Sequence, residues 1–176
     1  MNRTRRLTHI ALLVALALAL HSLEAALPLP GAVPGARLGL ANIITLLALL
    51  LYGFRTAIFV ATVRSVLGSF FAGNFLAFAL YLSLAGAVFS TVAMTLALWG
   101  WRRGVFSLTA VSVIGAVVHN TAQVAVASLL IGNINLLRLY LPLLLALAVP
   151  AGIITGLTVF YVWKALVRAV RDLPES

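Results

Sequence analysis

The sequence predicts an all-α integral membrane protein with six transmembrane helices and both termini in the cytoplasm. Of its 176 residues, 64% are hydrophobic and 9% are charged, whereas a soluble domain carries about 25% charged residues. Six apolar runs approach the length of about 20 residues that crosses a bilayer. Basic residues gather at alternate breaks between these runs. So few charges leave too little polar surface for a water-soluble globule, and a bilayer is the solvent that suits this chain.

The six expected helices cover residues 7–27, 38–52, 55–72, 76–99, 105–131 and 140–166, and residues 1–176 are treated as a single transmembrane domain. Glycine, proline and asparagine mark the breaks between them, as turn residues do. The second run is short, because a helix over 38–52 rises about 22 Å and the hydrocarbon core is about 30 Å thick. Pro142 is expected in the first turn of the last helix, where a missing amide hydrogen costs little.

The basic residues predict the orientation, because cytoplasmic loops carry an excess of lysine and arginine. In the six-helix arrangement Arg37 and Arg138 lie on one side and Arg64 lies within the membrane. The other side holds nine basic residues: Arg3, Arg5, Arg6, Arg55, Arg102, Arg103, Lys164, Arg168 and Arg171. This bias places both termini and the turns near 53–55 and 100–104 in the cytoplasm. The net charge of +9 is therefore assigned to loops facing anionic lipid, and no nucleic-acid partner is expected.

Composition also limits the chemistry of the chain. It contains no cysteine, which excludes disulfides, thiolate nucleophiles and cysteine–metal sites. Its three histidines lie on separate segments without ligand spacing, so no metal and no other cofactor is expected. A G-x-x-x-x-G-K-[ST] loop for ATP is absent as well. Active transport would therefore need separate ATPase and coupling subunits.

Polar side chains inside a bilayer are costly and mark candidate functional sites. Here they concentrate in the outer half of the expected helices, while the inner half is almost purely apolar. This asymmetry predicts a polar cavity that opens outward. His119 and Gln123 share a helix face four residues apart, and they either line this site or hydrogen-bond between helices. The residues expected to bind a substrate are Arg37, Asn42, Arg64, Ser69, His119, Asn120 and Gln123.

Arg64 is the most costly of these residues. A guanidinium near the middle of a membrane needs a carboxylate, backbone carbonyls, water or an anionic ligand. Glu24 is the only carboxylate within an expected span, and its pairing with Arg64 or with Arg37 would lock helices without any ligand. The alternative is a polar or anionic ligand held by Arg64, Arg37 or Arg138. Both interpretations stay open at this point.

The first apolar run has two features that allow alternatives. Its basic start and apolar core resemble a signal peptide, but the run is longer than a usual signal core, which favours an uncleaved helix. Ala11, Ala15 and Ala19 are four residues apart and form a stripe that permits close approach of another helix. Packing within the chain would use the same stripe, so an internal contact and a partner contact are both open.

Four motifs resemble a known bacterial membrane family. They are GARLGLANIITL at 35–46, RSVLGSFFAG at 64–73, SLAG at 83–86 and GAVVHNTAQ at 115–123. The family is named heptaprenyl diphosphate synthase component I, or the Gx transporter family, and the resemblance covers roughly residues 8–165. The family is itself similar to the substrate-binding S components of energy-coupling factor (ECF) transporters. The resemblance implies a six-helix bundle in the bacterial plasma (inner) membrane with an outward site.

The resemblance also implies partners. In S components a helix-1 alanine stripe contacts the transmembrane coupling subunit, so Ala11, Ala15 and Ala19 are candidates for such a contact. The family name points instead to a soluble prenyl diphosphate synthase subunit. The chain cannot be a synthase by itself, because such enzymes bind diphosphate through magnesium on aspartate-rich motifs and Asp172 is its one aspartate.

Three hypotheses follow. The leading one is a substrate-binding subunit of an uptake transporter for a vitamin-like or anionic small molecule. The second is an accessory, non-catalytic membrane component of polyprenyl diphosphate synthesis. The third is a structural membrane subunit without a ligand.

Overall fold

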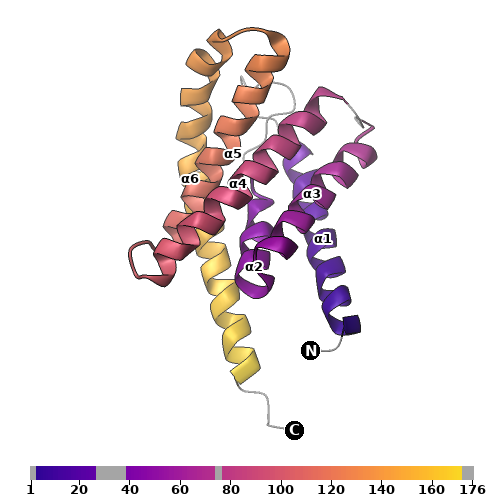
Figure 1. Ribbon diagram of the computed structural model, residues 1–176, viewed down its shortest axis with the longest axis vertical. Helices are drawn as coiled ribbons and strands as arrows, with labels where there is room; N and C mark the ends of the chain where they lie inside the picture. The colour runs from indigo at the N-terminus through magenta and orange to yellow at the C-terminus, as the bar shows by residue number, and fades with distance from the viewer. Residues whose placement is uncertain (1–2, 27–38, 74–76, 172–176) are drawn as a thin grey trace.

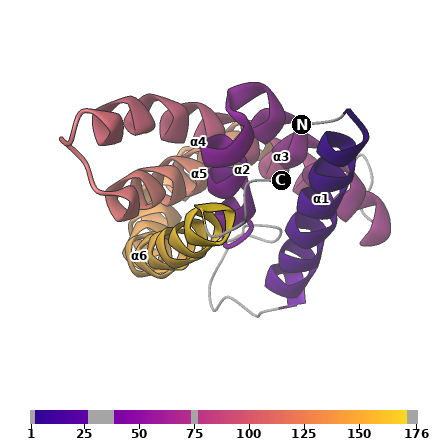
Figure 2. The same cartoon turned by 90° about the horizontal axis from the view of Figure 1, so that it is seen from below.

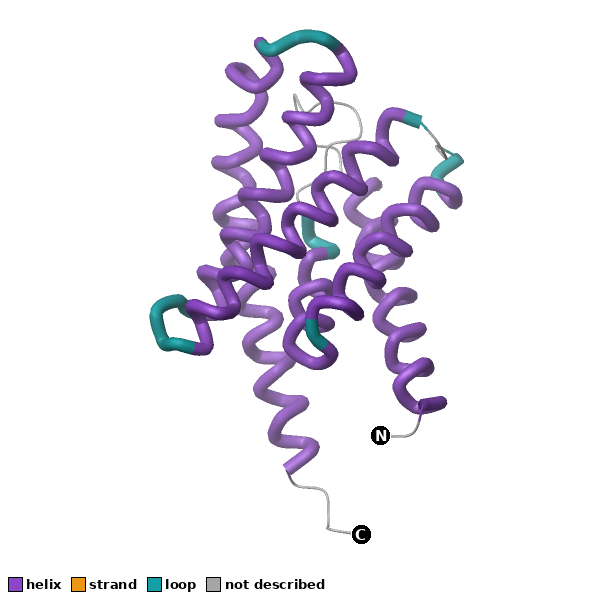
Figure 3. The backbone as a smooth tube through the Cα atoms, viewed as in Figure 1, coloured by secondary structure: helices purple, strands orange, loops and turns teal. Residues whose placement is uncertain are grey.

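The computed structural model describes residues 3–26, 39–73 and 77–171, and this part of the chain consists of helices joined by turns (Figures 1 and 3). The helices are α1 (Arg3–Ala26), α2 (Asn42–Tyr52), α3 (Phe54–Phe71), α4 (Phe78–Arg102), α5 (Leu108–Ile131) and α6 (Asn135–Arg171). Their order and number agree with the sequence prediction.

The distribution of apolar residues is that of a membrane protein. Five helices are long and apolar enough to cross a bilayer, and α2 is a shorter apolar helix. Large hydrophobic side chains point outward on these helices, for example Phe71, Leu96 and Leu129, which are 69%, 70% and 80% exposed. Serine, threonine, asparagine, glutamine, histidine and arginine side chains are buried between the helices. An apolar exterior around a partly polar interior suits lipid as the solvent, and the predicted all-α membrane protein is confirmed.

The short helix α2 is the centre of the bundle. It packs against each of the other five helices, and seven of its eleven residues are buried. The view along the bundle from the end with the termini places it between α1 on one side and α4, α5 and α6 on the other (Figure 2). A helix of 11 residues rises about 16 Å, too little to cross a bilayer alone. The central helix is therefore held by protein rather than by lipid.

Two helix boundaries differ from the prediction for local reasons. The helix expected over 38–52 begins at Asn42, because Gly39 has φ of 87° and its carbonyl accepts the Asn42 amide at 2.8 Å in a turn. The last helix begins at Asn135, not near 140, because the Asn133 side chain accepts the Asn135 amide at 3.0 Å. Pro142 therefore lies inside α6, with Pro150, and its expected place in the first turn is wrong.

The two ends of the bundle have different interiors. Both termini lie at the same end (Figure 1), so α1, α3 and α5 run away from it and α2, α4 and α6 return. Toward this end the interior is mainly apolar, with Leu13, Leu46, Val60, Leu98 and Val111 among its buried residues, and its buried polar side chains are hydroxyls such as those of Thr56 and Ser112. Toward the opposite end, the buried stripes of the same helices become polar. The uneven distribution of buried polar residues agrees with the sequence, and the assignment of the polar end to the outer face stays a prediction.

α5 and α6 form the closest helix pair. A Cβ atom on Gly152 or Gly156 would lie 2.7 Å from the Cα atoms of Val113 or Thr109, respectively, so the two backbones nearly touch. Between these glycines, the Thr155 hydroxyl is 2.7 Å from the Ser112 hydroxyl. Small residues and an interhelical hydrogen bond are the usual means of joining membrane helices.

Candidate functional site

A group of buried polar side chains occupies the end of the bundle opposite the termini; we call it the polar cluster. Every member is at most 4% exposed, although five different helices contribute. The members are His21 and Glu24 of α1, Asn42 and Thr45 of α2, Arg64, Ser65 and Ser69 of α3, Ser83 of α4, and His119, Asn120 and Gln123 of α5.

The carboxylate of Glu24 joins α1 to the start of α2. Its Oε1 atom accepts hydrogen bonds from the backbone amides of Gly39 and Leu40, the second at 3.2 Å. These amides precede the first turn of α2, so the carboxylate lies where the helix dipole favours a negative charge. This bond could not be predicted from the sequence, because it joins residues 15 positions apart across a proline-rich segment.

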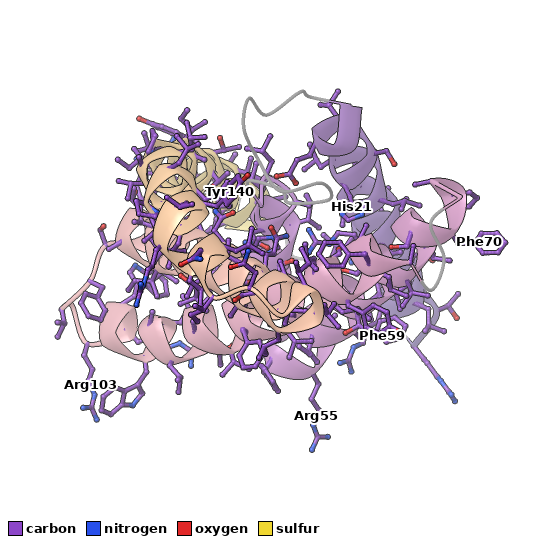
Figure 4. All side chains as sticks on the ribbon, turned by 90° about the horizontal axis from the view of Figure 1, so that it is seen from above. His21, Arg55, Phe59, Phe70, Arg103 and Tyr140 are labelled. Atoms are coloured by element: carbon purple, nitrogen blue, oxygen red, sulfur yellow. The ribbon has the colours of Figure 1, made fainter. Side chains whose placement is uncertain are left out.

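Each histidine of the polar cluster packs against a glycine of a neighbouring helix. The His21 ring of α1 lies directly on Gly68 of α3, and Figure 4 shows His21 inside the bundle, whereas Arg55, Arg103 and Phe70 point away from it. The His119 ring of α5 lies on Gly86 of α4, where a Cβ atom would come within 2.7 Å of Cε1. These glycines therefore leave room for imidazole rings between closely packed helices.

His119 lies between α4, its own helix α5 and the turn that precedes α2. Its Nε2 atom is 2.8 Å from the Gln123 amide nitrogen one turn further along α5. On its other side, a Cβ atom on Gly39 would lie 3.3 Å from the His119 ring and 3.0 Å from the Asn42 amide nitrogen. The His119 ring and the Asn42 amide therefore both lie beside Gly39, whose backbone amide donates to the Glu24 carboxylate.

Arg64 is the largest fully buried side chain of the polar cluster, with 1% of its surface exposed. The next residue, Ser65, connects α3 to α4, because the Ser83 hydroxyl donates to the Ser65 hydroxyl at 3.1 Å. The Ser65 hydroxyl in turn donates to the carbonyl of Ala61 at 3.0 Å. The burial of Arg64 shows that its side chain lies within the bundle and does not extend to the surface.

Three amide or hydroxyl side chains of the polar cluster retain buried atoms without a hydrogen-bond partner in the described part of the chain. Both polar atoms of the Asn42 amide, the Thr45 hydroxyl and the Asn120 carbonyl oxygen belong to this group. An unsatisfied buried polar group costs about 1–3 kcal/mol. Because buried polar atoms in folded proteins nearly always have a partner, these exceptions mark the polar cluster as a candidate binding site.

The structure buries most of the predicted site residues between the helices. Asn42, Arg64, Ser69, His119, Asn120 and Gln123 all lie in the polar cluster. Arg37 lies outside the described residues. Arg138 is exposed on α6 and does not belong to the polar cluster. The sequence prediction omitted Thr45 as a site residue and gave no role to Gly39, Gly68 and Gly86, although all four lie in the quoted family motifs.

The alanine stripe of α1 is not used for packing within the described bundle. Ala11, Ala15 and Ala19 are exposed, whereas Leu13 and Ala17 on the opposite side of the helix are buried. The structure therefore leaves the stripe accessible to another helix, and its contact with a partner stays a prediction.

A hollow of about 370 Å³ lies away from the polar cluster, on the lipid side of α4 and α5. Its lining is apolar apart from one hydroxyl and consists of Phe89, Val118, Thr121, Ala122, Ala125, Val126 and Leu129. The outward polar cavity expected from the sequence does not coincide with this hollow, and its opening stays a prediction.

These features define a class of protein: an all-helical membrane protein with a buried polar cluster at one end of its bundle. The model of the family described as heptaprenyl diphosphate synthase component I matches residues 13–162, which include the whole polar cluster. The chain belongs to this family, as the four motifs indicated. No curated protein matches the chain, and neither does any solved structure.

Proposed function

We propose that the chain is the membrane-embedded substrate-binding subunit of a small-molecule uptake system, with the role that S components have in ECF transporters. The observation that carries this proposal is the polar cluster itself. Charged and amide groups are costly within a membrane, and five helices bury them in the polar cluster. Helix association alone would not require side chains with unsatisfied atoms. A polar ligand that enters the polar cluster would complete their hydrogen bonds.

The chemistry of the polar cluster suits a small ligand with both charge and hydrogen-bonding groups. Arg64 offers a planar guanidinium for a carboxylate or phosphate group. Asn42, His119, Asn120 and Gln123 add neutral donors and acceptors around it. The cluster faces the outside in the orientation predicted from the arginines and lysines, so capture would occur from the outer face of a bacterial plasma membrane. Energy would come from separate ATPases through a coupling subunit, which the exposed stripe Ala11, Ala15 and Ala19 would contact.

A second candidate function is supported by the family description. An accessory component of heptaprenyl diphosphate synthesis would leave the chemistry to a soluble synthase subunit. Prenyl diphosphates in the cytosol would require a basic site at the cytoplasmic end of the bundle. The polar cluster lies at the end opposite both termini, where the orientation prediction places the outer face. The placement of the polar cluster therefore favours the substrate-binding role.

Native mass spectrometry of the protein in lipid nanodiscs tests the proposed function. We expect a small molecule to co-purify with the wild-type protein and to be lost in Arg64→Ala. Arg55→Ala is the matched control, because Arg55 is an exposed arginine on the same helix α3. Retention of the ligand by Arg64→Ala would contradict an arginine-centred site. Arg64→Lys keeps the positive charge, so its comparison with Arg64→Ala separates the effect of losing the charge from the effect of a disturbed fold. Absence of any ligand in every variant would favour the structural subunit instead.

A further inference from the structure

Three buried side chains limit which hydrogen-bonding groups a ligand can have, beyond the charge that Arg64 would select. They are Asn42, Thr45 and Asn120. Each is at most 4% exposed, and together they hold the buried amide and hydroxyl atoms without a partner in the described part of the chain. Asn42 and Thr45 are three positions apart, so they lie on the same face of α2. Asn120 follows His119 on α5, and the His119 ring and the Asn42 amide both lie beside Gly39. Because α2 packs against α5, the three residues belong to the two helices that face each other in this part of the polar cluster.

The Thr45 hydroxyl differs from other helical hydroxyls of this chain. Those of Thr91, Thr95, Thr121 and Thr158 each donate to the carbonyl four residues earlier, at 2.6–2.8 Å. This internal bond is the simplest way to satisfy a threonine in a membrane helix. Thr45 is 0% exposed and does not make it, although Ala41 is four residues before it. Its hydroxyl is therefore available to another group.

The Asn120 amide has a fixed direction. Its nitrogen donates to the carbonyl of Ala116 at 3.2 Å, which leaves its oxygen as an acceptor without a partner. Asn42 offers one acceptor and one donor. The two oxygens can be satisfied only by N–H or O–H groups, because an asparagine oxygen accepts and never donates. A fully ionised phosphate or carboxylate has acceptors alone and would leave both oxygens unsatisfied.

We propose that Asn42, Thr45 and Asn120 recognise a ligand edge with N–H donors next to a carbonyl acceptor, as in a cyclic amide such as a pyrimidinone or a purinone. This inference rests on the proposed substrate-binding function and narrows its ligand class. The Asn42 amide would pair with the neighbouring donor and acceptor of that edge. The Asn120 oxygen would accept a further N–H, and the Thr45 hydroxyl would bond to either kind of group. A prenyl diphosphate has no such donors and does not fit this site.

The proposal predicts different effects of two threonine substitutions on the unfolding temperature of the ligand-free protein. Thr45→Val removes an unsatisfied buried hydroxyl with little change of shape, so we expect a higher unfolding temperature. Thr91→Val is the matched control, since its buried hydroxyl is already bonded to Ala87, and we expect no increase. A lower unfolding temperature for Thr45→Val than for wild type would overturn the inference, because it would show that the hydroxyl is already satisfied.

Binding of defined probes tests the ligand class directly. Uracil, hypoxanthine, nicotinamide, inorganic diphosphate and farnesyl diphosphate would be titrated into the protein in nanodiscs by calorimetry. We expect at least one of the three amides to bind, with about tenfold weaker binding by Thr45→Val and Asn42→Leu and unchanged binding by Thr91→Val. Failure of all three amides, or amide binding that both substitutions leave unchanged, would overturn the inference.

The same measurements separate this inference from the proposed function. If a co-purified ligand depends on Arg64 but has no N–H donor, the substrate-binding function stands and the ligand class is wrong. If no molecule co-purifies and none of the probes binds, the substrate-binding function and the proposed ligand class are both wrong.

Discussion

Glycine and histidine pairs are the residue-scale feature that shapes the polar cluster. Gly68 makes space for His21, and Gly86 makes space for His119, each across a helix interface. Gly39 combines close contact with His119 and a positive φ of 87°, which other residues rarely adopt. Its amide also donates to Glu24. A single position therefore sets the backbone turn, the carboxylate contact and the spacing of two candidate ligand-binding side chains.

Replacing Gly39 by alanine should be more damaging than the same change at Gly53. Both glycines have positive φ, 87° and 79°, so both variants lose about 1–3 kcal/mol from backbone strain. At Gly39 the new methyl group would also lie 3.0 Å from the Asn42 amide and 3.3 Å from the His119 ring, whereas Gly53 has open space around it. Unfolding in mixed detergents and ligand binding measure the difference. Equal stability and binding of the two variants would contradict a steric role for Gly39.

The carboxylate of Glu24 gives a second residue-scale prediction. Glu24→Gln keeps one acceptor oxygen for the Gly39 and Leu40 amides but loses the charge, and hydrogen bonds to charged groups contribute about 1.5–3 kcal/mol. We expect a loss of about 1 kcal/mol for Glu24→Gln and a larger loss for Glu24→Leu, measured by unfolding in mixed detergents. Ser22→Ala, at an exposed position of the same helix, is the control. Equal stability of Glu24→Leu and wild type would show that this contact contributes nothing.

At the scale of elements, periodicity and composition predicted the helices but not their mutual contacts. Apolar runs identify spans because lipid requires them. The true starts of α2 and α6 depend on single backbone features, the positive φ of Gly39 and the Asn133 side chain, which hydropathy does not register. The polar cluster could be predicted because burying polar groups in a membrane is rare. Its links through Gly68 and Gly86 could not, because they depend on which helices become neighbours.

The contact between α5 and α6 provides an element-scale prediction. Alanine is a better helix former than glycine by about 1 kcal/mol, but a methyl group at Gly156 would lie 2.7 Å from the Cα atom of Thr109. Overpacking costs about 1–3 kcal/mol of folding free energy. Because the contacted atom belongs to the backbone and cannot move aside as a side chain can, this cost should exceed the gain in helix propensity. We expect Gly156→Ala to unfold at lower denaturant than wild type. Ile154→Ala, at a position 63% exposed on the same helix, should differ little. Stabilisation by Gly156→Ala would mean that the helices are further apart.

At the scale of the whole molecule, the alanine stripe of α1 is a surface of small residues that the described bundle does not use for packing. The stripe Ala11, Ala15 and Ala19 lies on the outer side of α1. Ala15→Trp should therefore leave folding and ligand binding unchanged. It should lower the recovery of a membrane partner about tenfold in pull-downs from cross-linked native membranes, which corresponds to a loss of about 1.4 kcal/mol of binding free energy. Ile154→Trp places the same bulk on exposed α6 and serves as the control. Equal recovery by both variants would remove the stripe from the partner surface.

The orientation of the molecule decides between the two candidate functions, and the chain is suited to measuring it. It has no cysteine, so single-cysteine variants can be labelled without background. Ile134→Cys lies in the turn between α5 and α6, and Arg103→Cys lies between α4 and α5, at opposite ends of α5. Because the excess of basic residues predicts a cytoplasmic α4–α5 turn, an impermeant maleimide should label Ile134→Cys in intact cells and Arg103→Cys only after permeabilisation. Val60→Cys, which is 0% exposed, should resist labelling in both conditions. The reverse pattern would place the polar cluster toward the cytoplasm, where a prenyl diphosphate could reach Arg64, and the accessory role in prenyl synthesis would then be favoured.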